Sequence, residues 1–554
     1  MRRSLPLFTL LFTAVCVAVQ LSVGVYATGR SLTGDEASHM VNSLLVYDWL
    51  REGPLLDPVG YAQEYYRHFP RVTVGHWPPL LYVVQAGVFA LAGRSSAAAL
   101  GFQAVVAGLA CALPASLVRR RLGWAAGLAT GLAVLASPDL LFMLDAVMAD
   151  TLLALLVLVA ALCWARFAAT GRTGWAVLFA AAASAAILTK GNGFALALLP
   201  LIHAVLTRSL RALLNPRTWL VAGIVAVATL PWYALTWQMT ADGFNYAWGW
   251  DYTGRAVPAY TAGLPGVVGL IGLAGFAAAL WTMPLWTMLG RRRAAPPDHE
   301  LAALAAAALA VFLFQLVAPA DITMRYLVAL VPSAAVVAAV GLAHGLRAFR
   351  VRRAAVLGGA TAALLLANAA AIFVAPHLSP FGMRALARDI VDRDGANPLV
   401  LVAADTRAEG ALIAAFAELD PRRTHYVLRA TQMLARGGFM AQGYATRFPD
   451  AGAVGRWLAD SGIGWLVVDL SGEADFLPHD RQVAEIVNAS GWTPVAVVER
   501  PGGEVRLYRL QAAPPTTAQL DALLSHVVPN TALALAQKND SNAASTDSGA
   551  SSAR

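Results

Sequence analysis

The chain has 554 residues, of which 58% are hydrophobic and 13% charged, and its mean hydropathy is +0.59. This composition excludes an ordinary soluble globular protein, and the apolar residues fall in long blocks, as membrane-spanning segments do. The net charge of +8 does not indicate a nucleic-acid partner, because the basic residues form short clusters between the apolar blocks. Cys16, Cys111 and Cys163 lie far apart inside apolar blocks, so neither a disulfide nor a zinc framework is expected.

The apolar blocks predict eleven membrane spans. The first, 6–28, is longer than the apolar core of a signal peptide, so we expect it to stay uncleaved, although Val25-Tyr26-Ala27 resembles a cleavage site. A further apolar stretch, Pro78–Ala92, reaches only about 22 Å as a helix, short of the roughly 30 Å of a bilayer core. The other ten predicted spans are 97–118, 123–140, 151–169, 174–189, 193–207, 218–238, 263–289, 300–319, 326–346 and 354–375.

The arginine clusters decide the orientation. If Pro78–Ala92 lies in the membrane interface, every cluster falls on the cytoplasmic side, as the positive-inside rule requires. The segment 29–96 is then a large external loop with interfacial helices. These clusters are Arg2/Arg3, Arg119–Arg121, Arg166/Arg172, Arg208/Arg211/Arg217, Arg291–Arg293 and Arg347/Arg350/Arg352/Arg353.

Beyond residue 375 the chain changes character. Short β-rich runs alternate with helical patterns over 376–512, which predicts an extracytoplasmic α/β domain. Residues 513–554, rich in Ala, Ser, Thr and Asn, are typical of a disordered tail. The predicted strands are Leu399–Ala403, Thr424–Leu428, Gly464–Val468, Val495–Val498 and Val505–Leu510.

The first external loop opens with acidic residues. Thr33 and Glu36 have the spacing of a capping box, and Asp35 would favour the positive end of a helix dipole. His39 follows one helical turn after Asp35, a weak indication of a metal site. The helix beginning here would place an apolar face in the membrane interface. That face consists of Met40, Val41, Leu44, Leu45 and Trp49.

Several short motifs on the predicted external side resemble the GT-C glycosyltransferases of the protein O-mannosyltransferase and aminoarabinose-transferase type. The resemblance covers roughly residues 1–350 and implies a polytopic α-helical GT-C fold. One departure is that Trp77, not His or Lys, precedes Pro-Pro, and His76 is one residue earlier. The motifs are Gly34-Asp35-Glu36, His76–Tyr82, Val147–Thr151, Leu188–Gly191 and Arg325-Tyr326-Leu327.

The resemblance implies transfer of a sugar from a polyprenyl-phosphate donor to an acceptor at the outer face of the inner (plasma) membrane. The phosphate leaves as a stable anion, so the reaction needs one carboxylate base and cations that meet the developing charge. Asp35 is the candidate base, and direct displacement would invert the anomeric carbon. Lys190, Arg325 and His76 are candidates for the phosphate.

The remaining site candidates are Glu36, as a second catalytic residue, and Asp150 and Tyr326, as substrate-binding residues; the first two have structural alternatives. Glu36 could only cap its helix, and Asp150 or its neighbour Asp145 could simply be solvated. A divalent metal, with Glu36, His39 and His76 as candidate ligands, is left open as the only cofactor.

Three further residues have ordinary alternatives of their own. Lys190 could cap a helix end, Arg325 could pair with Asp321, and His76 could pack beside Trp77.

Two other classes of function are open. A lipid or sugar transporter or flippase would be expected to place charges near the midplane, often with internal repeats. A non-catalytic scaffold displaying the 376–512 domain would leave the external polar residues without a purpose. The sequence does not name the sugar or the acceptor, which could be a lipid, a glycan or a protein; membrane lipids are the other expected partners.

Overall fold

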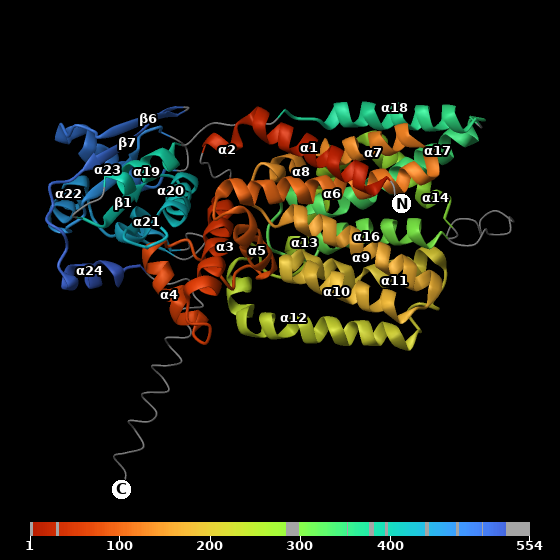
Figure 1. Ribbon diagram of the computed structural model, residues 1–554, viewed down its shortest axis with the longest axis horizontal. Helices are drawn as coiled ribbons and strands as arrows, with labels where there is room; N and C mark the ends of the chain where they lie inside the picture. Colours follow the sequence, from red (N-terminus) through yellow and green to blue (C-terminus); the bar gives the residue numbers. More distant parts are fainter. Residues whose placement is uncertain are drawn as a thin grey trace, which may run out of the picture.

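The computed structural model describes residues 4–28, 33–283, 298–351, 353–375, 382–393, 397–437, 443–472, 476–500 and 502–527. Within these ranges, a long bundle of helices carries an α/β domain at one end (Figure 1). The predicted arginine clusters Arg2/Arg3 and Arg291–Arg293 lie outside the described residues, as does Arg352.

The helices of the bundle and of its first connecting loop precede residue 375. They are α1 (Leu5–Val23), α2 (Val25–Thr28), α3 (Gly34–Glu52), α4 (Pro58–His68), α5 (Leu80–Ala92), α6 (Ser96–Leu122), α7 (Trp124–Leu135), α8 (Pro138–Leu144), α9 (Asp150–Thr170), α10 (Thr173–Thr189), η1 (Gly191–Ala197), α11 (Leu199–Thr207), α12 (Pro216–Asp242), α13 (Trp250–Val268), α14 (Leu270–Trp281), α16 (His299–Gln315), η2 (Met324–Leu330), α17 (Val331–Ala348) and α18 (Ala354–Ile372).

Six helical segments of the described chain are long and apolar enough to cross a membrane, or up to eight if each of two bent helix pairs counts as one span. Three predicted spans, at 174–189, 193–207 and 300–319, fall on apolar helices shorter than 18 residues, so length and composition do not confirm the count of eleven. The α5 helix, predicted to lie in the interface, is also short, with 13 residues.

The two bent pairs change the predicted segmentation. The α7 and α8 helices meet at 73°, and α13 and α14 meet at 103°. The sequence predicted an external segment over 239–262 and one span over 263–289. In the structure α12 extends to Asp242 and α13 runs from Trp250 to Val268, so helix covers much of the predicted external segment and the end of α13 falls within the predicted span. The external position of 239–262 stays a prediction.

A side chain from another helix accommodates the sharper bend. Gly269, at the break between α13 and α14, has a φ of 77°, which favours glycine. Asn368 of α18 accepts a hydrogen bond from Gly272 N (3.1 Å) and donates one to Val268 O (2.9 Å). It thereby satisfies backbone groups that the break releases inside an apolar bundle. Such a long-range contact is not readable from the local apolar pattern.

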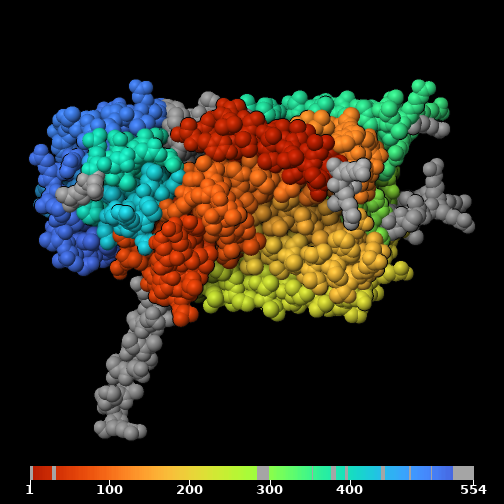
Figure 2. Space-filling model, in the orientation of Figure 1, coloured from red at the N-terminus to blue at the C-terminus, as the bar shows by residue number. Residues whose placement is uncertain are grey.

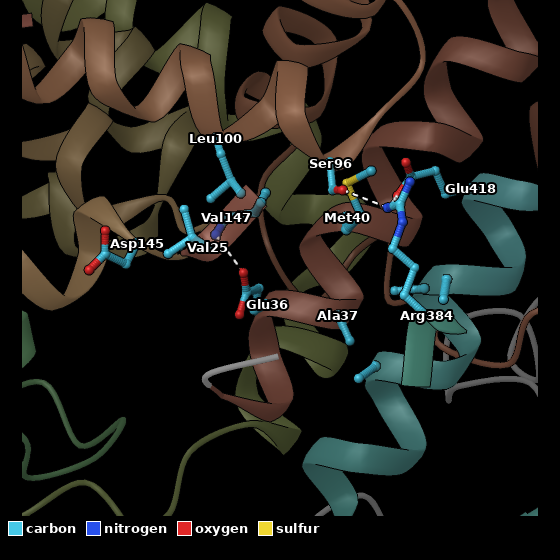
Figure 3. A pocket seen from close by; sticks show the side chains of 13 residues that line it. Val25, Glu36, Ala37, Met40, Ser96, Leu100, Asp145, Val147, Arg384 and Glu418 are labelled. Atoms are coloured by element: carbon cyan, nitrogen blue, oxygen red, sulfur yellow. Dashed lines mark hydrogen bonds and ion pairs between the residues drawn. The ribbon is translucent and has the colours of Figure 1, made fainter. Parts of the chain in front are cut away.

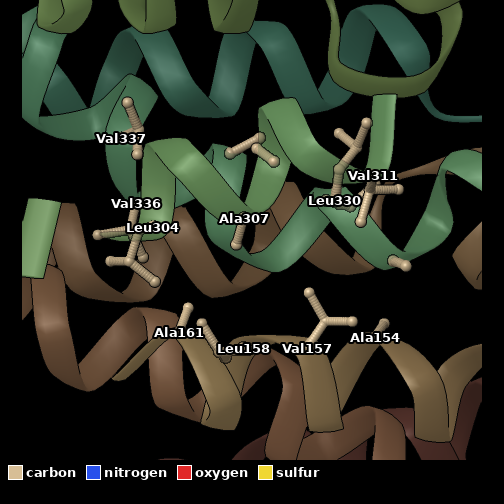
Figure 4. Packing of buried hydrophobic residues seen from close by; sticks show 14 of the residues in the cluster. Ala154, Val157, Leu158, Ala161, Leu304, Ala307, Val311, Leu330, Val336 and Val337 are labelled. Carbon is tan, nitrogen blue, oxygen red and sulfur yellow. The ribbon is translucent and has the colours of Figure 1, made fainter. Parts of the chain in front are cut away.

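Small residues let the bundle helices approach closely. Ala154, Val157, Leu158 and Ala161 of α9 face α16 and α17 in a core rich in alanine and valine (Figure 4). Because neighbouring lipid is as apolar as leucine, close packing of small side chains is what holds such helices together.

The C-terminal domain contains a five-stranded sheet of order β2-β1-β5-β7-β6, with β1 parallel to β2 and β5, and β7 antiparallel to β5 and β6. All five long strands fall where the sequence predicted them, and β3 and β4 form a separate pair. The elements are α19 (Met383–Asp392), β1 (Leu399–Ala403), α20 (Thr406–Leu419), β2 (Tyr426–Arg429), α21 (Ala430–Met433), β3 (Ala435–Arg436), β4 (Ala445–Thr446), α22 (Ala451–Asp460), β5 (Trp465–Asp469), α23 (Pro478–Ser490), β6 (Ala496–Arg500), β7 (Gly503–Arg509) and α24 (Thr517–Leu524).

The α24 helix corrects part of the prediction for 513–554, because this segment begins with regular structure. Thr516 caps α24 by accepting a hydrogen bond from Gln519 N (3.3 Å). Residues 528–554 lie outside the described residues.

The first loop and the C-terminal domain share one hydrophobic core. Met40, Val41, Leu44 and Leu45 of α3 are at most 4% exposed and belong to the same cluster as β1 and α20. The prediction that this face of α3 lies in the membrane interface is therefore wrong. An apolar helical stripe has the same pattern whether a lipid or a protein surface covers it.

Candidate functional site

The acidic helix start of the first loop meets a distant arginine. Thr33 caps α3 by accepting from Glu36 N (3.2 Å), which places Asp35 in the first turn. Asp35 Oδ2 accepts a hydrogen bond from Arg325 Nη2 of η2 at 2.8 Å, with side chains 32% and 21% exposed. Arg325 therefore pairs with Asp35, whereas the alternative drawn from the sequence was a local pair with Asp321.

A second ion pair lies beside the first. Lys190 Nζ, at the C-terminal end of α10, donates to Asp150 Oδ1 in the first turn of α9 at 2.6 Å. Both side chains are at least nine-tenths buried. Lys190 is thus both a helix-capping residue, as its alternative held, and the partner of a buried carboxylate.

Tyr326 joins the two ion pairs. Lys190 Nζ lies 4.7 Å and Arg325 Cζ 5.4 Å from the centroid of its ring. Both distances are within the range of cation–π attraction. The structure therefore gathers Asp35, Arg325, Lys190 and Tyr326 with Asp150 into one cluster of two acids, two cations and one aromatic ring.

Electrostatics keep Asp35 ionised. Burial would by itself raise the pKa of the Asp35 carboxyl, but the charge and hydrogen bond of Arg325 outweigh it and hold the pKa below its usual value. His39, one turn along α3, is neutral, because burial lowers its pKa to about 4. His39 Nδ1 lies 3.0 Å from the hydroxyl of Tyr82.

His76 contacts α12 and Trp77. Its Nδ1 forms a hydrogen bond with the carbonyl oxygen of Met239 (3.1 Å), and its ring packs edge-on against Trp77 at 4.6 Å. Trp77 also packs against the ring of His39, with 4.7 Å between the ring centroids. The packing beside Trp77 that was the alternative for His76 is thus present, and a phosphate role for His76 stays a prediction.

The Glu36 side chain points toward Val147 (Figure 3). Its Oε1 accepts from Val147 N at 3.1 Å, so this carboxylate ties α3 to the connection between α8 and α9. Glu36 and Asp145 line a small pocket of about 50 Å³, with Arg384 and Glu418 of the C-terminal domain on its other side (Figure 3). Of the two neighbouring acids, Asp150 joins the ion-pair cluster and Asp145 joins this pocket.

The residues proposed as metal ligands do not form one site. Among the described residues, no group of three or more His, Cys, Asp or Glu side chains could hold a metal ion. Within the candidate set, His39 contacts Tyr82, His76 contacts Met239 and Glu36 contacts Val147.

Sequence reasoning missed Tyr82 and Arg71. Tyr82 ends the motif that begins at His76, and an aromatic hydroxyl in that apolar stretch was the available signal. Arg71 Nη2 donates to Thr406 O of α20 (2.5 Å), a contact across 335 residues for which the sequence offers no signal.

The sequence of the chain matches one known protein family over part of its length. Residues 76–237 match the sequence profile of the dolichyl-phosphate-mannose-protein mannosyltransferase family. That stretch contains His76, Asp150 and Lys190, but neither Asp35 nor Arg325. No curated protein sequence matches the chain.

Solved structures match along most of the chain. ArnT from Cupriavidus metallidurans bound to undecaprenyl phosphate has a TM-score of 0.53 at 17% identity, and its apo state has 0.54 at 18%. Each match covers 92% of this chain and 99% of ArnT. The oligosaccharyltransferase of Archaeoglobus fulgidus, in complex with Zn and sulfate, has a TM-score of 0.49 at 14% identity, covering 83% of this chain and 68% of its own.

The chain therefore has the fold of a polytopic helical membrane protein. Within that class it shares the ArnT-like arrangement of a helical bundle followed by a C-terminal domain that contains a sheet.

Proposed function

We propose that the chain is a membrane glycosyltransferase that moves a sugar from a polyprenyl-phosphate donor to an acceptor, with Asp35 as the base. The observation that carries this proposal is the pairing of Asp35 with Arg325 beside the pair of Asp150 and Lys190, joined through Tyr326. The match to ArnT, whose structure holds undecaprenyl phosphate, supports the class of donor.

The reaction uses the four charges in two roles. The acceptor oxygen forms a bond to the anomeric carbon while the bond from that carbon to the phosphate oxygen breaks, which inverts the configuration. The phosphate keeps the electron pair, and its charge is met by Arg325 and Lys190. Asp35 takes the proton of the acceptor hydroxyl.

The ion pairs explain how one cluster can serve both roles. Asp35 paired with Arg325 is a weak base, because the guanidinium stabilises its ionised form. A donor phosphate competes for Arg325 and Lys190 and leaves the two carboxylates less neutralised. Asp35 then becomes a stronger base when the donor is in place, whereas Asp150 stays beside Lys190 and orients it.

The remaining candidates have supporting roles. Glu36 holds the first turn of α3 through Val147 N, and the Tyr326 ring keeps both cations beside each other. His76 is placed at the edge of the site, where it packs on Trp77. No step of the reaction is assigned to a metal.

We place the reaction at the outer face of the inner membrane, with residues 376–512 as an extracytoplasmic domain. The first loop, which carries Asp35, lies against the C-terminal domain at one end of the bundle (Figure 1, Figure 2), and a Cβ on Gly34 would lie 3.3 Å from Thr406 Cγ2 of α20. At the other end, Arg120 and Arg121 pair with Glu300 at the start of α16. The positive-inside rule assigns an arginine-rich end to the cytoplasm.

Turnover of a defined donor tests the function. Purified protein in lipid nanodiscs, given a panel of radiolabelled undecaprenyl-phosphate sugars and a membrane-lipid extract as acceptor, should release undecaprenyl phosphate from one of them. Asp35→Asn should lower this rate at least about 100-fold, the low end for loss of a general base. Asp57→Asn in the same loop is the control, because Asp57 is exposed and only caps α4.

Two outcomes would contradict the proposal. If Asp35→Asn matched the wild type, the assignment of the base would be wrong. If the wild type released carrier from no member of the panel but carried donors across a vesicle membrane, the transporter interpretation would replace the enzyme.

A further inference from the structure

The helix that carries Asp35 is attached along its length to a helix of the C-terminal domain. The α3 and α20 helices run side by side in the same direction, with Gly34 near Thr406 at one end and Asp48 linked to Ala417 at the other. Figure 3 shows Ala37 of α3 pointing toward α20, beside the pocket that Glu36 lines. A change in the spacing of these two helices would therefore displace the first turn of α3, which carries Asp35.

The closest approach of the two helices needs a glycine. Gly410 of α20 is buried, and a Cβ at this position would lie 2.9 Å from Cβ of Ala37. Carbon atoms in proteins are not found so close, and Ala37 has no flexible side chain that could turn away. A methyl group at residue 410 must therefore push α3 and α20 apart.

Two arginines fasten the ends of this helix pair. Arg71 donates to Thr406 O at 2.5 Å, next to the start of α3. Arg94 forms a bidentate ion pair with Asp48 of α3 (2.9 and 2.7 Å) and donates to Ala417 O at 2.6 Å and to Glu418 O at 2.7 Å. Carbonyls at a helix C-terminus favour such a cation, so this contact joins α3 firmly to the end of α20.

The same face of α3 is closed by apolar packing. Met40, Val41, Leu44 and Leu45 lie in the core of the C-terminal domain, which leaves α3 no lipid-facing surface on that side. A helix held by packing in the middle and by ion pairs at its ends has little freedom to slide or rotate.

We infer that α20 of the C-terminal domain positions Asp35 for the reaction, and that Gly410 and Ala37 are the positioning residues at the contact. The inference rests on the proposed function. Transfer reactions are sensitive to misplacement, since a shift of about 1 Å in a reacting group can cost on the order of 100-fold in rate. The C-terminal domain thus helps to hold Asp35 in place for the reaction.

A pair of matched substitutions tests the contact in the full-length protein. Gly410→Ala and Gly455→Ala each replace a helical glycine of the same domain, so both gain helix propensity. A Cβ at Gly455 would meet Ile486 at an ordinary 3.9 Å. We expect Gly410→Ala to lower kcat for carrier release about 10- to 100-fold with little change in the KM for the donor, and Gly455→Ala to leave both unchanged.

Restoring the space should restore the rate. In the double variant Ala37→Gly/Gly410→Ala the methyl group is on the other helix, and the contacts that its Cβ keeps, with Arg71 Nε and Nη2 at 3.3 Å, are with the end of a long side chain that can move by a few tenths of an ångström. The helices can then regain their spacing, and kcat should return to within about threefold of the wild type. Hydrogen–deuterium exchange of the segment 33–45 should rise in Gly410→Ala and return in the double variant. A glycine needed only for folding would lower the yield or the thermal stability of Gly410→Ala and leave the kcat of the folded protein unchanged.

The outcomes separate the inference from the proposed function. If Gly410→Ala folds and matches Gly455→Ala in kcat and in exchange, the inference is overturned. It is also overturned if the double variant recovers exchange but not kcat. If the wild type releases carrier from no undecaprenyl-phosphate sugar, the proposed function and the positioning of a catalytic group fail together, whereas the exchange data still decide whether α20 restrains α3.

Discussion

Asp35 and Arg325 are 290 residues apart in the sequence, and their side chains form an ion pair of 2.8 Å between the first loop and η2. The pair lies at the end of the bundle that carries the C-terminal domain. Its guanidinium group stabilises the ionised form of Asp35, the proposed base. Each carboxylate of the cluster has one cation, so the cluster is neutral before a donor arrives. A phosphate entering it would meet cations that are already oriented, which lowers the reorganisation needed during reaction.

Removing Arg325 should shift the pH dependence of turnover. In the wild type, Arg325 lowers the pKa of Asp35, so the base is ionised down to acidic pH. In Arg325→Gln burial dominates and raises this pKa, so the acid limb of the pH–rate profile should move to higher pH. The rate of carrier release at its pH optimum should also fall about 100-fold, because a cation facing the departing phosphate is lost.

The profile of carrier release between pH 4 and pH 9 measures both effects. Arg255→Gln serves as the control, because Arg255 is an exposed residue of α13. An acid limb that stays at the wild-type pH in Arg325→Gln would separate Arg325 from the titration of Asp35.

The pair of Asp150 and Lys190 should behave as a buried ion pair. Asp150→Asn leaves the Lys190 ammonium buried without its counter-charge, which should lower the free energy of unfolding by about 3–5 kcal/mol. Asp150→Asn/Lys190→Gln removes both charges and should cost less than the two single changes added together.

Thermal unfolding of the four proteins in one detergent gives the coupling. Asp389→Asn supplies the scale for a weak pair, since Asp389 and Arg393 are 44% and 48% exposed and such pairs contribute about 0–1 kcal/mol. Additive effects at Asp150 and Lys190 would show that the two charges do not depend on each other.

The sequence predicted local structure better than long-range contacts. The continuous apolar, β-rich run Leu399–Ala403 is typical of a strand that is buried on both faces, and β1 coincides with it. The stripe of Met40 and Leu44 specifies burial but not the partner, so a protein core was mistaken for a membrane interface. The break at Gly269 depends on Asn368, about 100 residues away, and no local pattern encodes it.

In the site, too, the residues could be predicted from the sequence but their long-range contacts could not. External position and chemistry singled out Asp35, Lys190 and Arg325, and the structure brings all three together. The pairing itself could not be predicted, because Arg325 had an equally plausible local partner in Asp321. His76 was included for its residue type and its motif; its ring packs on Trp77, and its role toward the phosphate stays a prediction.

The C-terminal domain should lose stability as the pH rises toward 8. Burial, reinforced by the charge of Glu409, raises the pKa of Asp480 to about 8. The folded chain then holds a proton that the unfolded chain releases near pH 4, so this contribution to stability is complete below pH 4 and is lost as the pH rises to about 8. The loss should be on the order of 1–5 kcal/mol.

Asp480→Asn isolates this effect. The asparagine does not titrate, and its side-chain oxygen can still accept from Leu477 N, as Asp480 Oδ2 does at 3.1 Å. The variant should therefore lose less stability than the wild type between pH 5 and pH 9. Asp460→Asn, at the exposed end of α22, should keep the wild-type slope. Equal slopes in all three proteins would mean that Asp480 is ionised in the fold.

Cysteine labelling should reveal which end of the bundle faces the cytoplasm. Cys16, Cys111 and Cys163 are buried, so the native background should be low. Arg211 and Ser490 are both exposed, the first in an arginine-rich connection of the bundle and the second at the end of α23. With an extracytoplasmic C-terminal domain, an impermeant thiol reagent added to intact cells should label Ser490→Cys and not Arg211→Cys. Permeabilised cells should show both, which controls for accessibility. The reverse pattern in intact cells would place Asp35 on the cytoplasmic side, where the positive-inside rule could no longer explain the arginine clusters.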